Sequence, residues 1–158
     1  MATRTEIFAY VKAQLKTIKL GSSVTVKGTA YAYQTDIGRS IFPWRTSALG
    51  EKEKSDLTLR DEHSDRVDDE QGEFGLDKRN LRIPIEIRRR GKSTDAIAWI
   101  DKVITDLTAL IISNPRLGGL ARWSQLDQET KDLESHGTDI ASIALVLTVT
   151  YVPGPGEA

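Results

Sequence analysis

Large hydrophobic side chains recur every three or four positions between residues 93 and 114, STDAIAWIDKVITDLTALIISN. That spacing is the period of one helical face. Ser93, Thr94 and Asp95 can cap the first turn, and the proline at 115 disfavours helix at the residue before it. We therefore predict a long helix over 93–114 that buries a broad face. The apolar stripe and the second row that widens it are Ile97, Ile100, Ile104, Leu107 and Ile111, with Val103 and Leu110.

A period of two marks a pair of strands. Residues 140–151, IASIALVLTVTY, are nearly all apolar or β-branched, which is typical of a strand covered on at least one face. Residues 81–89, LRIPIEIRR, alternate aliphatic side chains with mostly charged ones. Because Pro84 cannot donate to a strand ladder, we expect this second strand to lie at a sheet edge or to contain a bulge.

The rest of the chain has shorter signals. Residues 3–18 repeat the helical period behind a capping box of Thr3 and Glu6, and Gly21 is expected to end that helix. Two β-prone pieces, 24–26 and 30–34, predict a hairpin around a glycine. Short strands are expected at 56–60 and 121–126. Leu120 and Trp123 are the expected anchors of the later segment, and 128–137 is expected to be an exposed turn.

Charge is segregated along a chain whose net charge is only −1. Residues 51–79 are rich in carboxylates and poor in apolar side chains, so we expect an extended charged loop or arm there. A basic cluster follows at the end of the alternating strand. The two sets are candidate subunit or partner contacts: Asp61, Glu62, Asp65, Asp68, Asp69 and Glu70 on the acidic side, and Arg88, Arg89, Arg90 and Lys92 on the basic side.

These elements predict an α+β fold. It comprises a mainly antiparallel sheet with the N-terminal helix and the helix at about 93–114 packed on it, plus the arm at about 51–79. A chain of 158 residues is expected to form one domain, over 1–152, with a flexible tail at 153–158. The absence of cysteine excludes disulfides, cysteine-based zinc sites and thiol catalysis. With no long apolar run and no leader-like segment, we expect a soluble, unprocessed chain and no membrane partner.

No residue pattern predicts catalysis or a cofactor. His63 lies among carboxylates but lacks the ligand spacing of a metal site, and the acidic run does not match a calcium-binding EF-hand loop. His136 has nearby carboxylates but no nucleophile elbow, and neither GxGxxG nor GxxxxGK[ST] occurs. We therefore expect no enzyme, no metal and no cofactor. The arginine cluster is interpreted as an interaction patch or a solvated strand end in preference to a nucleic-acid site, because aromatic residues are not interleaved.

The order of elements resembles the tail terminator and tail-completion proteins of long-tailed bacteriophages. The likeness rests on the amphipathic helix at 3–18, the charged middle segment and the strand LRIPIEIRRR. It continues through the helix STDAIAWIDKVITDLTALI and the closing run GTDIASIALVLTVTY, which ends in Tyr151. In that family the middle arm takes part in ring or tube contacts, a role that would fall here on residues 51–79.

The resemblance implies a structural virion protein. Copies of the chain would form a homo-hexameric ring on the head-proximal end of the tail tube, after assembly in the host cytoplasm. The ring would stop tube polymerisation and offer the surface for head attachment, with the tail-tube protein and a head-completion or connector protein as partners. Independently of the family, opposite charges at separate places suit a head-to-tail contact in which the acidic arm meets the next subunit's basic cluster. The alternatives are a head–tail joining or baseplate adaptor and a nucleic-acid-binding accessory protein.

Overall fold

The two longest paired strands form the centre of the sheet. In the computed structural model, which describes residues 2–66, 78–135 and 139–154, β6 (Arg79–Arg90) pairs with β8 (Asp139–Tyr151) in antiparallel register. The alternating aliphatic residues of β6 all lie on one face, where Ile83 is opposite Leu147 and Ile87 is opposite Ile143. These side chains are completely buried, so the predicted period-two strand is confirmed.

Four further strands complete a six-stranded sheet of order β3-β4-β6-β8-β7, with β5 beside β6. The short strands β3 (Ile41–Pro43), β4 (Ser55–Leu59) and β5 (His63–Arg66) precede β6 in the chain, and β7 (Trp123–Ser135) precedes β8. Every strand pair is antiparallel except β3 with β4. The α+β fold with a mainly antiparallel sheet is therefore confirmed.

Pro84 lies in a central strand, so the expected sheet edge is wrong, but the expected bulge is present in the neighbouring chain, where residues 60–62 face only residues 83 and 84 of β6. The pairing of β4 with β6 ends at Ile85, and the pairing of β5 with β6 begins at Arg82. The chain that runs beside Pro84 therefore belongs to neither strand. The Pro84 carbonyl accepts a hydrogen bond from the Arg60 amide on that side, at 3.3 Å. Since a strand residue points its nitrogen and carbonyl the same way, the missing N–H faces this interruption and costs no ladder bond.

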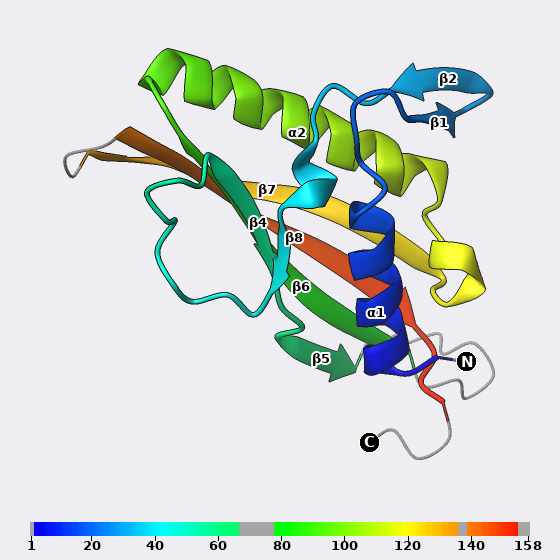
Figure 1. Cartoon of the computed structure of the whole chain (residues 1–158). Helices are drawn as coiled ribbons and strands as arrows, with labels where there is room; N and C mark the ends of the chain where they lie inside the picture. Colours follow the sequence, from blue (N-terminus) through cyan, green and yellow to red (C-terminus); the bar gives the residue numbers. More distant parts are fainter. Residues whose placement is uncertain (1, 67–77, 136–138, 155–158) are drawn as a thin grey trace.

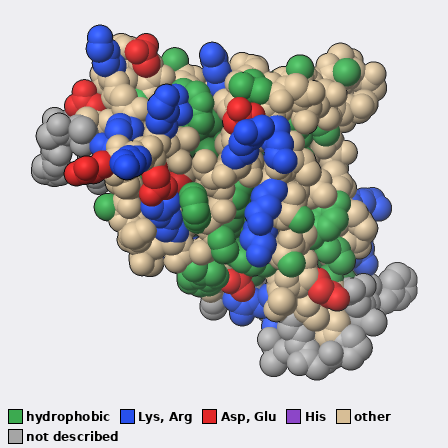
Figure 2. Space-filling model, in the orientation of Figure 1, with side chains coloured by type: hydrophobic (Ala, Val, Ile, Leu, Met, Phe, Trp, Pro, Cys, Tyr) green, Lys and Arg blue, Asp and Glu red, His purple; other side chains and the backbone are tan. Residues whose placement is uncertain are grey.

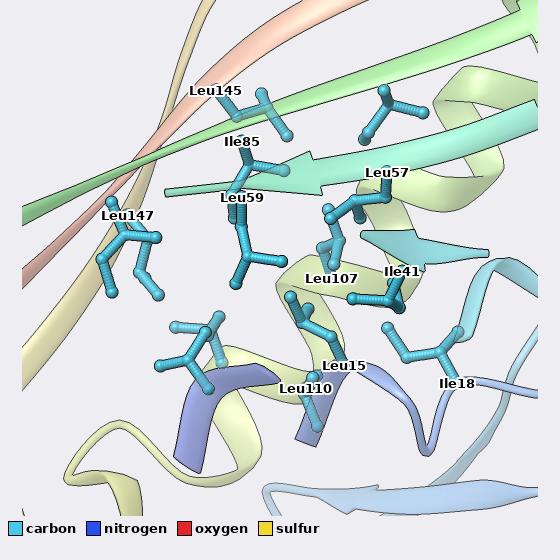
Figure 3. Close-up of a cluster of buried hydrophobic side chains, with 14 of the residues drawn as sticks. Leu15, Ile18, Ile41, Leu57, Leu59, Ile85, Leu107, Leu110, Leu145 and Leu147 are labelled. Atoms are coloured by element: carbon cyan, nitrogen blue, oxygen red, sulfur yellow. The ribbon is translucent and has the colours of Figure 1, made fainter. Parts of the chain in front are cut away.

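Both helices cover the same face of the sheet (Figure 1). The long helix α2 (Ser93–Ser113) and the N-terminal helix α1 (Arg4–Leu15) enclose an aliphatic core with the inward side chains of the strands. Figure 3 shows this cluster, in which Leu15 and Leu107 from the helices approach Leu57, Leu59 and Ile85 from the sheet. Burying such side chains is the main favourable term of folding.

The buried face of α2 is rotated from the predicted stripe. Ile97 is 36 % exposed and Ile104 is half-buried, whereas Asp106 is completely buried. The predicted caps at Ser93, Thr94 and Asp95 are absent, because Lys92 occupies the N-cap position without a side-chain bond. The predicted end of the helix before Pro115 is confirmed. The apolar residues that the helix does bury are Ala96, Ile100, Val103, Leu107, Ala109, Leu110 and Ile111.

The capping box of α1 is confirmed, but the helix ends earlier than predicted. Thr3 and Glu6 exchange side-chain hydrogen bonds with each other's backbone amides at 2.8 and 3.2 Å. The helix ends at Leu15, before the expected Gly21. Gly38, in the short helix η1 (Ile37–Arg39), lies against this end and donates its amide to the Ile18 carbonyl at 2.9 Å.

The predicted hairpin is also confirmed, as β1 (Ser23–Val26) and β2 (Thr29–Ala32) around Gly28. It stands beside α2, away from the main sheet (Figure 1). Asp106 of α2 binds the chain that leaves the hairpin: it accepts from the Tyr31 hydroxyl at 2.7 Å and from the Thr35 hydroxyl at 2.6 Å. Burial, together with the bond to Asp106, raises the pKa of Tyr31 to about 12.

Two segments expected to be loops are strands. Residues 128–135 continue β7 along β8 after a register shift, where an exposed turn was predicted, and 63–66 form β5 within the predicted arm. A short helix, η3 (Leu117–Gly119), precedes β7. Of the predicted tail, Pro153 bridges to Ala2, and residues 67–77, 136–138 and 155–158 lie outside the described residues. Neither helix among the described residues combines the length and apolar character needed to cross a membrane.

Candidate subunit interface

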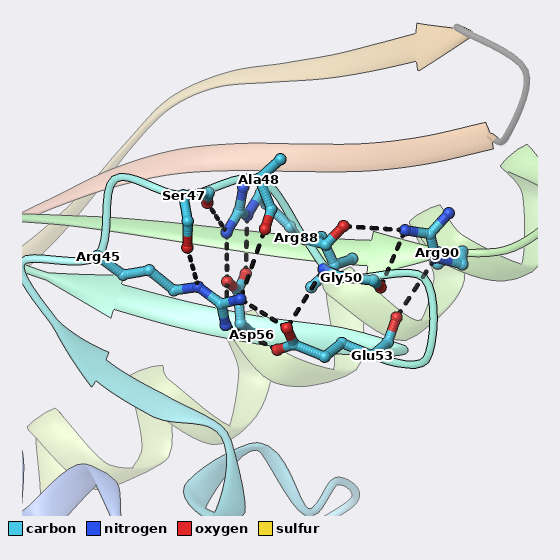
Figure 4. Close-up of polar contacts among 9 residues, drawn as sticks. Arg45, Ser47, Ala48, Gly50, Glu53, Asp56, Arg88 and Arg90 are labelled. Carbon is cyan, nitrogen blue, oxygen red and sulfur yellow. Dashed lines mark hydrogen bonds and ion pairs between the residues drawn. The ribbon is translucent and has the colours of Figure 1, made fainter.

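Arg88, one of the predicted interface arginines, is held inside the chain by the neighbouring strand (Figure 4). Asp56 of β4 lies opposite it and is completely buried. The guanidinium donates from Nε to one carboxylate oxygen at 2.9 Å and makes a second bond to the other, a pairing that raises the pKa of Arg88. It also donates to the Ser47 carbonyl at 3.0 Å. A buried carboxylate needs such partners because burying an unpaired charge is costly.

Arg90 holds the same loop, residues 44–54, which folds over the sheet face opposite the helices. Its guanidinium donates to the carbonyls of Leu49 and Gly50, both at 3.1 Å, and to that of Glu53 at 3.3 Å. Leu49, within this loop, is only 6 % exposed. These contacts fix the backbone of the connection between β3 and β4.

Arg45 forms an ion pair with Glu53 within the loop itself. It donates two bonds to the Glu53 carboxylate, at 2.6 and 2.7 Å, and also pairs with Asp56 at 3.3 Å. The bonds from Arg45 lower the pKa of Glu53 to about 2, although burial opposes the shift. The Arg45 guanidinium also lies over the Phe42 ring, 4.5 Å from its centre. The network therefore connects the loop to edge strand β3.

The basic residues do not form one patch. Arg89 points to the helical face, where its guanidinium stacks on Trp99 at 4.4 Å and burial lowers the pKa of Arg89. Lys92 is exposed before α2. Arg88 and Arg90 support the loop on the opposite face. A subunit contact through these four residues stays a prediction, and the structure assigns three of them intrachain roles that the sequence did not predict.

The acidic candidates lie toward the other end of β6. The Glu62 amide donates to the Arg82 carbonyl at 3.0 Å, and Asp61 forms an ion pair with Arg4 at 3.6 Å. Since Arg88 is six residues along the strand from Arg82, the two regions are separated by about 20 Å. Asp65 is in β5, opposite Asn80, and Asp68, Asp69 and Glu70 lie outside the described residues. The structure therefore does not bring the two charged sets together within the chain.

An apolar groove lies between edge strand β7 and the C-terminal half of α2. It encloses about 510 Å³. Two of its large hydrophobic side chains are exposed to solvent: Trp123 is 56 % exposed and Ile112 is 44 % exposed. The prediction that Trp123 is a buried anchor is therefore wrong, and Leu120 is only half-buried. The other apolar lining residues are Ile111, Pro115 and Leu126.

The opposite edge of the sheet also exposes aromatic side chains. Phe42 of β3 is 36 % exposed and Trp44, directly after it, is 54 % exposed. Trp44 has a φ of 56°, a left-handed conformation that is rare for a bulky residue. Its amide donates to the Leu59 carbonyl at 2.9 Å, which ties this backbone to β4.

The sheet face opposite the helices has a polar groove of about 310 Å³ beside the loop 44–54. Arg45, Arg60 and Arg82 line it together with Glu62 and Glu86, so both signs of charge are present. On the face of the molecule seen in Figure 2, basic and acidic side chains are likewise interspersed. Mixed charge of this kind does not provide the single-sign surface that phosphate binding requires.

The described part of the chain contains no candidate metal centre. Across those residues, no group of three or more His, Asp or Glu could hold a metal ion. The expectations of no metal, cofactor or catalysis stay predictions. What sequence reasoning missed are the exposed tryptophans and the buried Asp106: aromatic residues default to the core and helical carboxylates to solvent, and no local signal reverses either assignment.

No known protein-family model matches the chain, and no curated protein is significantly similar to it in sequence.

Proposed function

We propose that the chain is a structural subunit, not an enzyme, and that its copies close into a ring on the head-proximal end of a bacteriophage tail tube as a tail terminator. The observation behind this proposal is a pair of sheet edges that no other described strand covers and that expose aromatic side chains. These are Trp123 at the start of β7, and Phe42 in β3 with Trp44 directly after it. The order of elements that resembles tail terminators supports the specific assignment.

Unpaired edges need an explanation in a stable protein. A long edge strand such as β7, with 13 residues, offers unused backbone donors and acceptors to other chains. Natural proteins blunt or cover such edges, and exposed apolar patches next to them are typical of interaction sites. Tryptophan is among the residues most enriched at the energetic centre of interfaces. A subunit that is covered by its neighbours in an assembly satisfies these requirements.

Nucleic-acid binding has less support than assembly. Two of the three clustered arginines, Arg88 and Arg90, make their hydrogen bonds within the chain, and Arg89 stacks on Trp99. Binding to double-stranded DNA is therefore expected to be weak and to change little with salt concentration. Tight binding that falls steeply with salt concentration would favour the accessory-protein alternative.

The direct test is tube termination. Tail-tube protein from the same virus is polymerised with and without this chain, and tube lengths are measured by negative-stain electron microscopy. A terminator is expected to shorten the tubes and to appear as a cap at one end. Tubes of unchanged length with no bound chain would contradict the proposal, and binding along the tube or at a baseplate instead would favour the adaptor alternative.

A further inference from the structure

We infer that the exposed aromatic edge of one copy, Phe42–Pro43–Trp44, docks into the apolar groove of the next copy, between β7 and the C-terminal half of α2. The inference rests on the proposed ring and specifies which surfaces meet. The occupant of the groove is thus a second copy of this chain. We call the first surface the aromatic edge and the second the β7 groove.

The positions of the two surfaces suit head-to-tail contact. β3 and β7 are at opposite ends of the strand order, four inter-strand steps apart. At about 4.8 Å per step, this separates the edges by roughly 19 Å within one chain. Because the two complementary surfaces lie at opposite edges of the subunit, one copy cannot present both of them to the same neighbour. Each copy therefore uses the aromatic edge for one neighbour and the β7 groove for the other. Repetition of such a heterologous contact gives a closed ring when the rotation closes.

The chemistry of the two surfaces is complementary. The β7 groove is lined mainly by aliphatic and aromatic groups, including Ile112, Pro115 and Trp123, and its volume of about 510 Å³ leaves room for an aromatic side chain. The aromatic edge supplies two rings that are only partly covered within their own chain. Other large hydrophobic side chains among the described residues that are comparably exposed are few: Leu20 and Ile97.

The aromatic edge is held in place before docking. Trp44 has the left-handed φ of 56°, and its conformation is maintained by the amide bond to Leu59. The loop that follows is fixed by the pairs Arg45–Glu53 and Arg88–Asp56. A tryptophan held outward in an unfavourable conformation by a rigid network suits a binding role, because strain at functional sites persists only where the surroundings enforce it. Preorganisation also reduces the entropy lost on binding.

Disulfide trapping tests the contact, and the absence of cysteine from the wild-type chain makes it clean. One cysteine is placed beside the aromatic edge, at the exposed Thr46 (Thr46→Cys), and one at the groove, at the exposed Gln125 (Gln125→Cys). The double variant, treated with a mild oxidant, is expected to give a ladder of cross-linked dimers, trimers and larger species on a denaturing gel. Each single variant is expected to stay monomeric, because identical positions do not meet.

The alternatives give different gels. Dimers from Gln125→Cys alone would show that two β7 grooves face each other and would overturn the inference. An oxidised double variant without a ladder would also overturn it. If wild-type chains nevertheless form a ring, the proposed function stands and only the assignment of surfaces fails. If the wild-type chain is also monomeric, ring formation by the isolated chain fails as well.

A mixing experiment provides a second, independent measurement. Trp44→Ala is expected to raise the concentration for half-assembly by at least about 30-fold, which is about 2 kcal/mol for a central tryptophan. Trp44→Glu damages only the aromatic edge and Ile112→Glu damages only the groove. Each is expected to be monomeric alone, and an equimolar mixture is expected to stop at heterodimers, since one intact contact survives. Wild-type assembly by either variant alone would contradict the inference.

Discussion

Replacing Asp106 by alanine should cost more stability than any other polar truncation on α2. Its carboxylate is completely buried and accepts from the Thr35 hydroxyl at 2.6 Å, the Tyr31 hydroxyl at 2.7 Å and the Gln34 amide at 3.0 Å. All three donors come from the chain that follows β1, more than 70 residues earlier. The substitution therefore weakens the connection between the hairpin and the long helix.

The magnitude follows from the burial of each donor. Thr35 is 1 % exposed, so its hydroxyl finds no water after the change, and losing a charge-assisted bond of this kind costs about 1.5–3 kcal/mol. Tyr31 and Gln34 are more accessible and can bond to water, so together they add about 1 kcal/mol. The expected loss is thus about 2.5–4 kcal/mol. A domain with a typical stability of about 5–15 kcal/mol still folds after this loss.

Urea unfolding followed by circular dichroism measures the effect as a lower midpoint at an unchanged m value. The corresponding fall in Tm is about 5–16 °C for a chain of this size. Asp106→Asn should give an intermediate loss of about 2 kcal/mol. The NH₂ group of the new asparagine can only donate, so it cannot accept the hydrogen bond that one Asp106 oxygen accepts in the wild type. The matched control is Asp95→Ala, an exposed carboxylate on the same helix, which should cost less than about 1 kcal/mol. A loss below 1 kcal/mol for Asp106→Ala would show that its buried hydrogen bonds contribute little to stability.

Three further predictions concern other described residues. Gly38→Ala should destabilise the fold by about 1–3 kcal/mol in the same urea assay, because overpacking forces backbone shifts and its Cβ would lie 2.5 Å from the Ile18 carbonyl oxygen; an unchanged midpoint would contradict this close approach. Alkaline pH should destabilise the wild type from about pH 10 through the folded-state pKa of about 12, because native Tyr31 keeps its proton after unfolded tyrosine has lost it. Unfolding across that range should be less pH-dependent in Tyr31→Phe, and equal slopes would argue against the assignment. Trp44→Gly should leave the free energy of unfolding unchanged or raise it by up to about 1 kcal/mol, since glycine tolerates the left-handed φ, while assembly weakens; a large loss of stability would show that Trp44 supports the fold of the single chain instead.

Periodic sequence patterns predicted the core of the fold. The alternation in β6 and the apolar run in β8 identified both central strands. In such a strand only one register places the apolar side chains on the buried face of the sheet. The polar strand β7 was partly missed. Its second half contains charged residues typical of a turn, yet it pairs with β8 from Thr130 to Ser135. Pairing with a well-defined neighbour overrode local propensity, as β5 also illustrates.

The rotation of α2 shows what a single-chain pattern leaves open. The same helix offers two adjacent apolar stripes, and the contacts of Asp106 with Thr35 and Tyr31 favour the one that exposes Ile97. Those partners are 71 and 75 residues away in sequence. The candidate interface was missed for a related reason: exposure of Trp44 and Trp123 depends on strand order, which places their strands at the two edges of the sheet.

The arginine cluster also shows why charge runs are ambiguous. In an alternating strand, adjacent arginines point to opposite faces, so Arg88 meets Asp56 while Arg89 meets Trp99. Sequence could predict this separation, but only the loop 44–54 supplies the carbonyl partners of Arg90. Arg88 and Arg90 fix the loop behind the aromatic edge.

The most direct test of the account is the solution mass of the wild-type chain, measured by light scattering across a concentration series with negative-stain images of the same samples. We expect a closed ring with a central hole and a mass near six times the 17.5 kDa of one chain. Dilution should yield smaller species without open filaments. A single-chain mass at every concentration, or a symmetric dimer that does not grow, would contradict assembly through two different edges of the sheet.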